Sequence, residues 1–131
     1  MDDFWKFNVT SATWVLIDGG TDAGATVNFD SNSPDYGPSK RFCSASWSIN
    51  NTFWMYGGFE YSDVWRYELN GAKKWVWESG SSIKLPNATY GTKGVASNSS
   101  LPRYRNFSFA RVLQGNRVAM FGGGFQGGNS R

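Results

Sequence analysis

The fold of this chain is decided by residues 54–67, which read WMYGGFEYSDVWRY. The first half of this stretch returns at residues 118–125 as VAMFGGGF, and the second half is matched at residues 3–7 by DFWKF. Trp5 precedes its counterpart Trp65 by 60 positions, and Gly57 precedes Gly122 by 65. Units that recur at a fixed period and cannot bury a core alone are typical of repeat architectures. The sequence therefore predicts a repeat fold with a binding or structural role.

The composition favours β-structure throughout. The 131 residues include seven Trp, six Tyr, ten Phe and 16 Gly, whereas only 18% are charged. Aromatic and β-branched side chains suit half-buried pleated surfaces, and glycines interrupt such strands at turns. No stretch keeps an apolar period of 3.6 residues, so we expect an all-β domain with no long helix.

Eight short strands separated by turns and two long polar stretches account for the whole chain. The pairs Asn50-Asn51, Asn70-Gly71 and Gly115-Asn116 tolerate positive φ and predict tight hairpins between strands. The expected strands cover residues 3–8, 13–17, 41–48, 52–56, 63–68, 74–78, 105–113 and 117–121. The two polar stretches, 18–40 and 79–102, fall at the same place in the repeat. Loops that lengthen on one face of a repeat array often form its binding face.

This pattern resembles the kelch repeat, the four-stranded blade of one class of β-propeller. The matching features are an apolar strand ending in Gly-Gly, an Asp-x-Trp strand, a later tryptophan and an Arg three positions after a Pro. In this chain they are Gly57, Gly58, Gly122 and Gly123; Asp3, Trp5, Asp63 and Trp65; Trp14 and Trp75; and Arg41 and Arg105. The family pattern usually has a His soon after that Arg, whereas this chain has no His. Its repeat also exceeds the usual length of about 50 residues, which the two long loops explain.

The resemblance implies about two blades, arranged as a half blade, a full blade and a half blade. Residues 1–17 would supply strands c and d of one blade, 41–78 a complete blade, and 103–131 strands a and b of the next. Residues 18–40 and 79–102 would be inter-blade loops. Propellers close with four to eight blades, so further blades would come from a longer chain or from identical copies, for instance three chains giving six blades.

The resemblance also gives physical roles to the matched residues. The glycine pairs would adopt positive φ where a strand leaves the sheet. The tryptophans of the Asp-x-Trp strands would pack between neighbouring blades. The carboxylates of Asp63 and Asp3 would accept hydrogen bonds from backbone groups or from Arg at the corner of a blade.

Five N-x-S/T sequons suggest a glycosylated protein. They begin at Asn8, Asn50, Asn87, Asn98 and Asn106. The first four lie in expected turns or loops, where a glycan could be accommodated, whereas Asn106 lies in an expected strand. We therefore expect an extracellular or cell-surface location, with a cytoplasmic one as the alternative. The sequence contains no run of 18 apolar residues, so we expect no membrane-spanning helix in it.

Aromatic side chains in the loops are candidates for contacts with a partner. They are Tyr36, Tyr61, Tyr90 and Phe125. Exposed aromatic residues anchor many protein interfaces, and they can also stack on sugar rings. The sequence does not identify the partner.

Catalysis and nucleic-acid binding are not expected. The chain lacks His, the commonest general base and metal ligand, and no carboxylates pair in an acid–base arrangement. The single Cys43, placed in an expected strand, excludes an internal disulfide and a thiolate metal site, and no cofactor is predicted. The net charge of +3 comes from interspersed residues rather than a basic stripe.

Three functions remain open. The leading hypothesis is a non-catalytic propeller segment of an extracellular glycoprotein that binds protein or glycan through its loop face. The second is a structural subunit that assembles into rings or fibres when copies complete each other's blades. The third is an intracellular kelch adaptor. Occupied sequons would contradict the third hypothesis.

Overall fold

The computed structural model describes residues 3–20, 29, 36–70 and 74–124. It is all-β, and the described residues contain no helix, as predicted. The eight strands are β1 (Phe4–Asn8), β2 (Thr13–Asp18), β3 (Ala45–Ile49), β4 (Thr52–Gly58), β5 (Tyr61–Glu68), β6 (Trp75–Gly80), β7 (Phe109–Leu113) and β8 (Arg117–Phe121).

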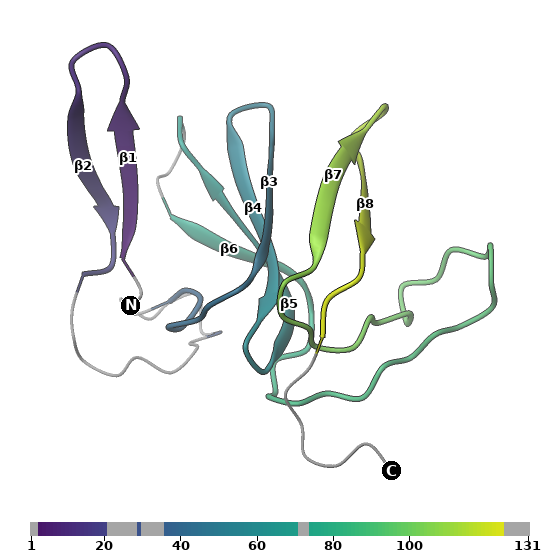
Figure 1. The fold of residues 1–131 in the computed structure, drawn as a ribbon. Coiled ribbons are helices and arrows are strands. Elements are labelled where there is room, and N and C mark those ends of the chain that lie inside the picture. The colour runs from purple at the N-terminus through teal and green to yellow at the C-terminus, as the bar shows by residue number, and fades with distance from the viewer. Residues whose placement is uncertain (1–2, 21–28, 30–35, 71–73, 125–131) are drawn as a thin grey trace.

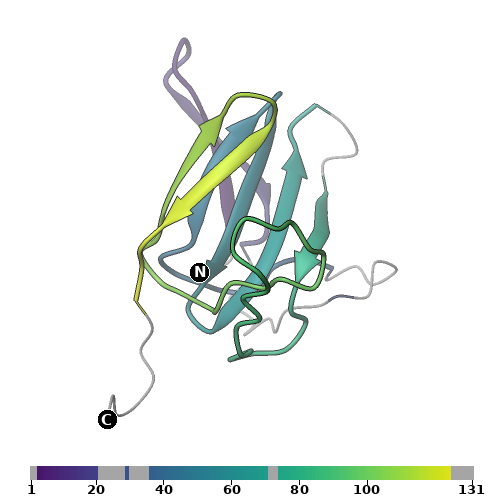
Figure 2. The ribbon, with the colours of Figure 1, turned by 90° about the vertical axis from the view of Figure 1, so that its right-hand side faces the viewer.

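The strands form three antiparallel sheets in chain order. β1 pairs with β2, the order β3-β4-β5-β6 makes a four-stranded sheet, and β7 pairs with β8. The three sheets lie side by side with the four-stranded sheet in the middle (Figure 1). In the view turned by 90°, the β7–β8 hairpin lies across one face of that sheet (Figure 2). The grouping of two, four and two strands agrees with the strand pairs expected from the repeat.

Two strands begin four residues later than the sequence predicted. The strand expected from Arg41 begins at Ala45, and the strand expected from Arg105 begins at Phe109. In both segments one residue has positive φ, Cys43 at 60° and Phe107 at 59°, and breaks the extended backbone before the sheet is reached. Placing Cys43 inside a strand was therefore wrong. The two breaks are 64 positions apart and so recur with the repeat.

Tight turns connect the strands of two hairpins. Asn50 and Asn51 have φ of 50° and 59° between β3 and β4, and Gly115 and Asn116 have φ of 70° and 56° between β7 and β8. Positive φ at both central residues defines the turn whose twist matches the flanking strands. The Asn70-Gly71 turn includes Gly71, which lies outside the described residues.

The core lies between β1–β2 and the four-stranded sheet. Met55, Trp65, Tyr67 and Trp75 form its buried centre. Phe4 packs on this cluster from β1, with its ring centroid 5.0 Å from that of Tyr67 and 5.4 Å from that of Trp75. Aromatic pairs at such separations add about 0.5–1.5 kcal/mol each beyond the burial of their area. The first hairpin is thereby fastened to one face of the central sheet.

The opposite face of the central sheet meets the last hairpin. Side chains alternate between the two faces of a strand, so Trp54 and Val64 point away from the core that Met55 and Trp65 enter. Together with Trp47 of β3 they line a cleft against Val118 of β8. The central sheet is therefore covered on both faces, whereas each terminal hairpin is covered on one.

Two tyrosines provide a matched test of this arrangement. Tyr67 is 1% exposed in the core, whereas Tyr90, in the long loop after β6, is 80% exposed. Tyr67→Ala should lower the free energy of unfolding by about 3–5 kcal/mol, as truncation of a buried aromatic ring does. Tyr90→Ala should change it by less than about 0.5 kcal/mol. Denaturant unfolding measures both, and equal effects would contradict the position of the core.

Candidate functional site

A buried ion pair lies at one corner of the central sheet. Arg41 Nη1 and Nη2 donate to Asp63 Oδ1 and Oδ2 at 2.7 and 3.0 Å, and the two side chains are only 6% and 0% exposed. Asp63 Oδ2 also accepts from the indole Nε1 of Trp65 at 2.6 Å. Arg41 donates further to the carbonyls of Gly57 at 3.1 Å and Ser39 at 3.3 Å. The charges are thus both paired and hydrogen-bonded, which burial of an ion pair requires.

The local backbone brings these groups together. Arg41 precedes β3, Gly57 lies near the end of β4, and Asp63 lies in β5, so one guanidinium connects three consecutive parts of the sheet. The guanidinium also lies over the ring of Tyr61, with its carbon 4.6 Å from the ring centroid. A planar guanidinium can bind a carboxylate with two parallel hydrogen bonds, stack on a ring and remain charged, which Lys cannot match.

Parts of the same corner recur in both terminal hairpins. Arg105 donates to the carbonyls of Gly122 at 3.1 Å and Arg103 at 3.2 Å, as Arg41 does to its own glycine and serine. Trp5 Nε1 donates to Asp3 Oδ2 at 2.6 Å, the distance found for the central pair. This indole hydrogen bond lowers the pKa of Asp3 below its usual value. The last hairpin thus carries the arginine half of the corner, and the first carries the carboxylate half.

A glycine at the end of β4 and another just after β8 allow a close backbone approach. A Cβ added to Gly58 would lie 2.7 Å from the carbonyl oxygen of Phe42, and one added to Gly123 would lie 2.7 Å from that of Asn106. Both glycines have positive φ, 87° and 85°. The glycine is therefore required at this point in both sheets by space and by backbone conformation.

Tyr56 ties the central sheet to the segment that leads into β7. Its hydroxyl donates to the carbonyls of Pro102 at 2.9 Å and Arg103 at 3.2 Å. Burial raises the pKa of Tyr56 to about 12. Sequence reasoning missed this contact, because it joins positions 46 and 47 residues apart and has no local signal.

Residues 36–44, which precede β3, and the connection after β6 both lie in the lower half of the view in Figure 1. The connection after β6 is held in place by Leu85 N–H, which donates to the Glu60 carbonyl at 2.8 Å, and by the bridge between Thr89 and Leu101. Despite these anchors it exposes several apolar side chains, namely Ile83, Leu85, Tyr90 and Val95. We refer to these four residues as the loop patch.

The four aromatic residues expected on the loop face differ in position. Tyr90 is exposed, as expected. Tyr61 is 4% exposed, so its assignment to the exposed surface was wrong. It lies in β5 and is spaced by two residues from the buried Asp63, so both side chains are on the same side of the strand as Trp65 and Tyr67. Tyr36 is half-buried, and its hydroxyl accepts a hydrogen bond from Trp77 N–H at 2.8 Å. Phe125 lies outside the described residues.

The sequons divide into exposed and buried positions. Asn8, Asn50, Asn87 and Asn98 are exposed, whereas Asn106 is 6% exposed. Asn106 also forms a bridge with Gly124 through both of its backbone groups, at 2.7 and 2.9 Å. Because this side chain is buried, a glycan attached to it could not extend into solvent.

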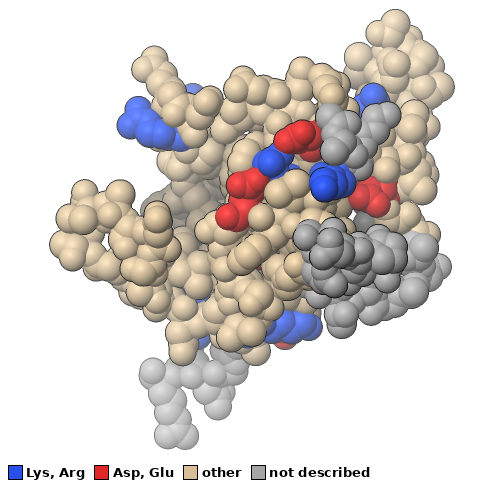
Figure 3. Space-filling model, turned by 180° about the vertical axis from the view of Figure 1, so that it is seen from behind, with Lys and Arg blue, Asp and Glu red and all other residues tan. Residues whose placement is uncertain are grey.

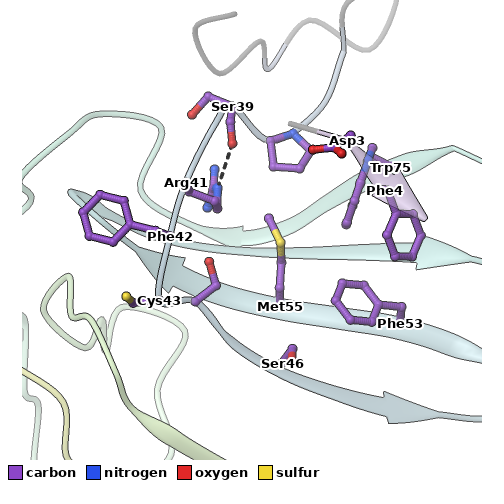
Figure 4. Close-up of a pocket in the computed structure, with 12 residues that line it drawn as sticks. Asp3, Phe4, Ser39, Arg41, Phe42, Cys43, Ser46, Phe53, Met55 and Trp75 are labelled. Carbon is purple, nitrogen blue, oxygen red and sulfur yellow. Dashed lines mark hydrogen bonds between the residues drawn. The ribbon is translucent and has the colours of Figure 1, made fainter. Parts of the chain in front are cut away.

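A cleft of about 300 Å³ lies between the first hairpin and the central sheet. Phe4, Phe53 and Trp75 line it on one side and Ser39 and Arg41 on another (Figure 4). Its arginine is already paired with Asp63. Within the described ranges no group of three or more His, Cys, Asp and Glu could hold a metal ion.

Charged side chains form mixed clusters on the surface. Arg66 of β5 lies between Glu68 and Glu78 and bonds to both. Seen from behind, acidic and basic side chains lie next to one another on a largely uncharged face (Figure 3). The described residues on this face form no extended basic stripe of the kind that binds nucleic acid.

Comparisons with protein-family models, curated proteins and solved structures found no match to this chain. In the described residues no helix is long and apolar enough to cross a membrane.

Removal of the buried carboxylate should lower the free energy of unfolding far more than removal of an exposed one. Asp63→Asn leaves the buried Arg41 charge without its partner and should destabilise the fold by about 3–5 kcal/mol. Glu60→Gln disrupts a more exposed pair, with Lys84 Nζ 3.2 Å from Glu60 Oε2, and should cost less than about 1 kcal/mol. Similar losses in denaturant unfolding would show that Arg41–Asp63 does not hold the corner.

Tyr56 should make the stability sensitive to alkaline pH. Its pKa of about 12 in the folded protein is raised from 10.0, so the stability it contributes is fully present below pH 10 and lost as pH rises through 12. The loss should reach roughly 2–3 kcal/mol. The difference in unfolding free energy between wild type and Tyr56→Phe should be constant below pH 10 and shrink above it. A difference that stays constant through pH 12 would contradict the burial of this hydroxyl.

Proposed function

We propose that this chain is a non-catalytic segment of a kelch-type β-propeller in an extracellular or cell-surface glycoprotein, and that it binds a protein or glycan partner through its long loops. The observation that carries the proposal is the recurrence of one hydrogen-bonded corner. Trp5 and Trp65 donate to their aspartates at the same 2.6 Å, and Arg41 and Arg105 donate to their glycines at the same 3.1 Å. Recurrence at this level supports a repeat of one structural unit rather than three unrelated sheets.

The loop patch supports a binding role. Loops displayed by a rigid scaffold are where binding residues concentrate, and here the scaffold is a sheet with an internal ion pair. Apolar side chains of the patch face solvent beside Lys84, which itself lies 5.7 Å from the Phe59 ring centroid. An amphipathic ring such as Tyr90 offers both a stacking surface and a hydroxyl to a partner. Specificity would then reside in the loop, whereas the sheet fixes its position.

The four exposed sequons support the extracellular location. They lie at the end of β1, in the β3–β4 turn and in the long connection after β6. Asn8 Oδ1 accepts hydrogen bonds from Thr10 N–H at 2.9 Å and Ser11 N–H at 3.3 Å, which holds the turn that follows it. Turns and loops of this kind are the surfaces on which secreted proteins carry N-glycans.

Glycan mapping of the protein isolated from its natural source tests this proposal. Enzymatic removal of N-glycans converts each occupied Asn to Asp, and mass spectrometry of the peptides locates the change. We expect conversion at one or more of Asn8, Asn50, Asn87 and Asn98, and none at the buried Asn106. An untreated sample controls for spontaneous deamidation. Conversion at none of the four would overturn the extracellular assignment and favour an intracellular adaptor.

A further inference from the structure

The two terminal hairpins carry complementary halves of the Arg–Asp–Trp corner. Arg105 binds the carbonyls of Gly122 and Arg103, but no described carboxylate contacts it. Asp3 accepts from Trp5, but no described Lys or Arg side chain contacts it. In the central sheet the same two halves are joined by the buried ion pair.

The strand edges next to these halves are also complementary. Among the described strands, β8 pairs only with β7, and β1 pairs only with β2. In the central sheet, the strand equivalent to β8 is β4, and the strand equivalent to β1 is β5; these two are antiparallel neighbours with Met55 opposite Trp65. Exposed edges with free N–H and C=O groups are templates for pairing with another chain.

The first hairpin exposes an apolar face that a monomer would leave in water. Trp5, Phe7, Trp14 and Leu16 share that face, because Trp5 is opposite Leu16 and Phe7 is opposite Trp14 in the register. They are 46%, 43%, 64% and 44% exposed. Large contiguous apolar patches are rare on monomers and often mark an interaction surface.

We propose that the β1–β2 hairpin of a second copy of this chain adds to the free edge of β8. The result is a four-stranded antiparallel sheet in the order β7-β8-β1-β2, with the last two strands from the second copy. Arg105 then pairs with Asp3 of the second copy, as Arg41 pairs with Asp63, and Met120 lies opposite Trp5 of the second copy. This proposal rests on the repeat alone and is independent of the extracellular binding role.

The charges determine which hairpin fits. A hairpin that completes this sheet needs a carboxylate two positions before a tryptophan on its first strand. Within the described residues, the two strands that meet this requirement are β5, which is already paired, and β1. The contact is head-to-tail, because each copy offers β8 to one neighbour and β1 to the other. Such contacts generate rings when the rotation closes and filaments when it does not.

Charge inversion on each side of the contact provides the test. Arg105→Asp would set two carboxylates against each other across the contact, and Asp3→Arg would set two guanidinium groups against each other. Each single variant should therefore associate roughly 30-fold or more weakly than wild type, the effect of disrupting a buried interfacial charge pair. An equimolar mixture of the two should regain association, because the inverted side of each variant then meets an opposite charge on the other. The double variant Asp3→Arg/Arg105→Asp should also associate.

Sedimentation velocity of the full chain across a concentration series measures these outcomes, with circular dichroism to confirm folding. We expect multimers for wild type and the double variant, at least dimers for the mixture, and monomers for each single variant at the same concentration. A monomeric wild type would overturn the proposal, as would single variants that associate like wild type. If either inverted variant fails to fold, Arg105→Gln and Asp3→Asn replace it, and unchanged association of both would overturn the proposal equally.

Discussion

The ion pair between Arg41 and Asp63 is the contact on which the rest of this structure depends. It lies at the point where the segment before β3, the end of β4 and the start of β5 meet, and it is excluded from water. A buried charge pair is tolerated when its remaining hydrogen-bonding capacity is filled, and here Trp65, Gly57 and Ser39 fill it. The same contact joins the segment before β3 to the neighbouring strands β4 and β5.

The terminal hairpins depend on the central sheet. Phe4 fastens β1–β2 to the core on one face, and Tyr56 fastens the segment before β7 on the other. Within the described residues, each two-stranded hairpin nevertheless keeps one uncovered face and two unpaired strand edges. We therefore expect most of the stability of the chain to lie in β3–β6. A scaffold of this kind can present variable loops without reorganising its core.

Most of the architecture could be predicted from local sequence. Aromatic and β-branched runs bounded by turn residues located all eight strands, and the pairs Asn50-Asn51 and Gly115-Asn116 located two hairpin turns. Predictions failed where non-local packing determines the backbone: the residues Cys43 and Phe107 adopt positive φ that neither side chain favours, so the starts of β3 and β7 were placed too early. Tyr61 was assigned to a loop because the strand was expected to begin at Asp63, whereas β5 begins at Tyr61. Its period-two alternation with Asp63 was the signal that indicated burial.

Part of the site could also be predicted from the sequence. The repeat singled out Arg41, Asp63 and the glycine pairs, and the possibility of an Arg–carboxylate hydrogen bond followed from their chemistry. That the arginine would also reach a glycine carbonyl and a tyrosine ring could not be inferred, since these contacts depend on the twist of the sheet. The tie from Tyr56 to Pro102 joins distant segments and has no local sequence signature.

Amide hydrogen exchange tests the central claim most directly, because it measures the free energy of opening strand by strand. If the corner of the central sheet holds the chain together, the amides of β4 and β5 should exchange most slowly and only by global unfolding. The amides of β1–β2 and β7–β8 should exchange through local opening at lower free energy in the dilute protein. Equal protection across all three sheets, or greater protection in a terminal hairpin than in β5, would contradict the account.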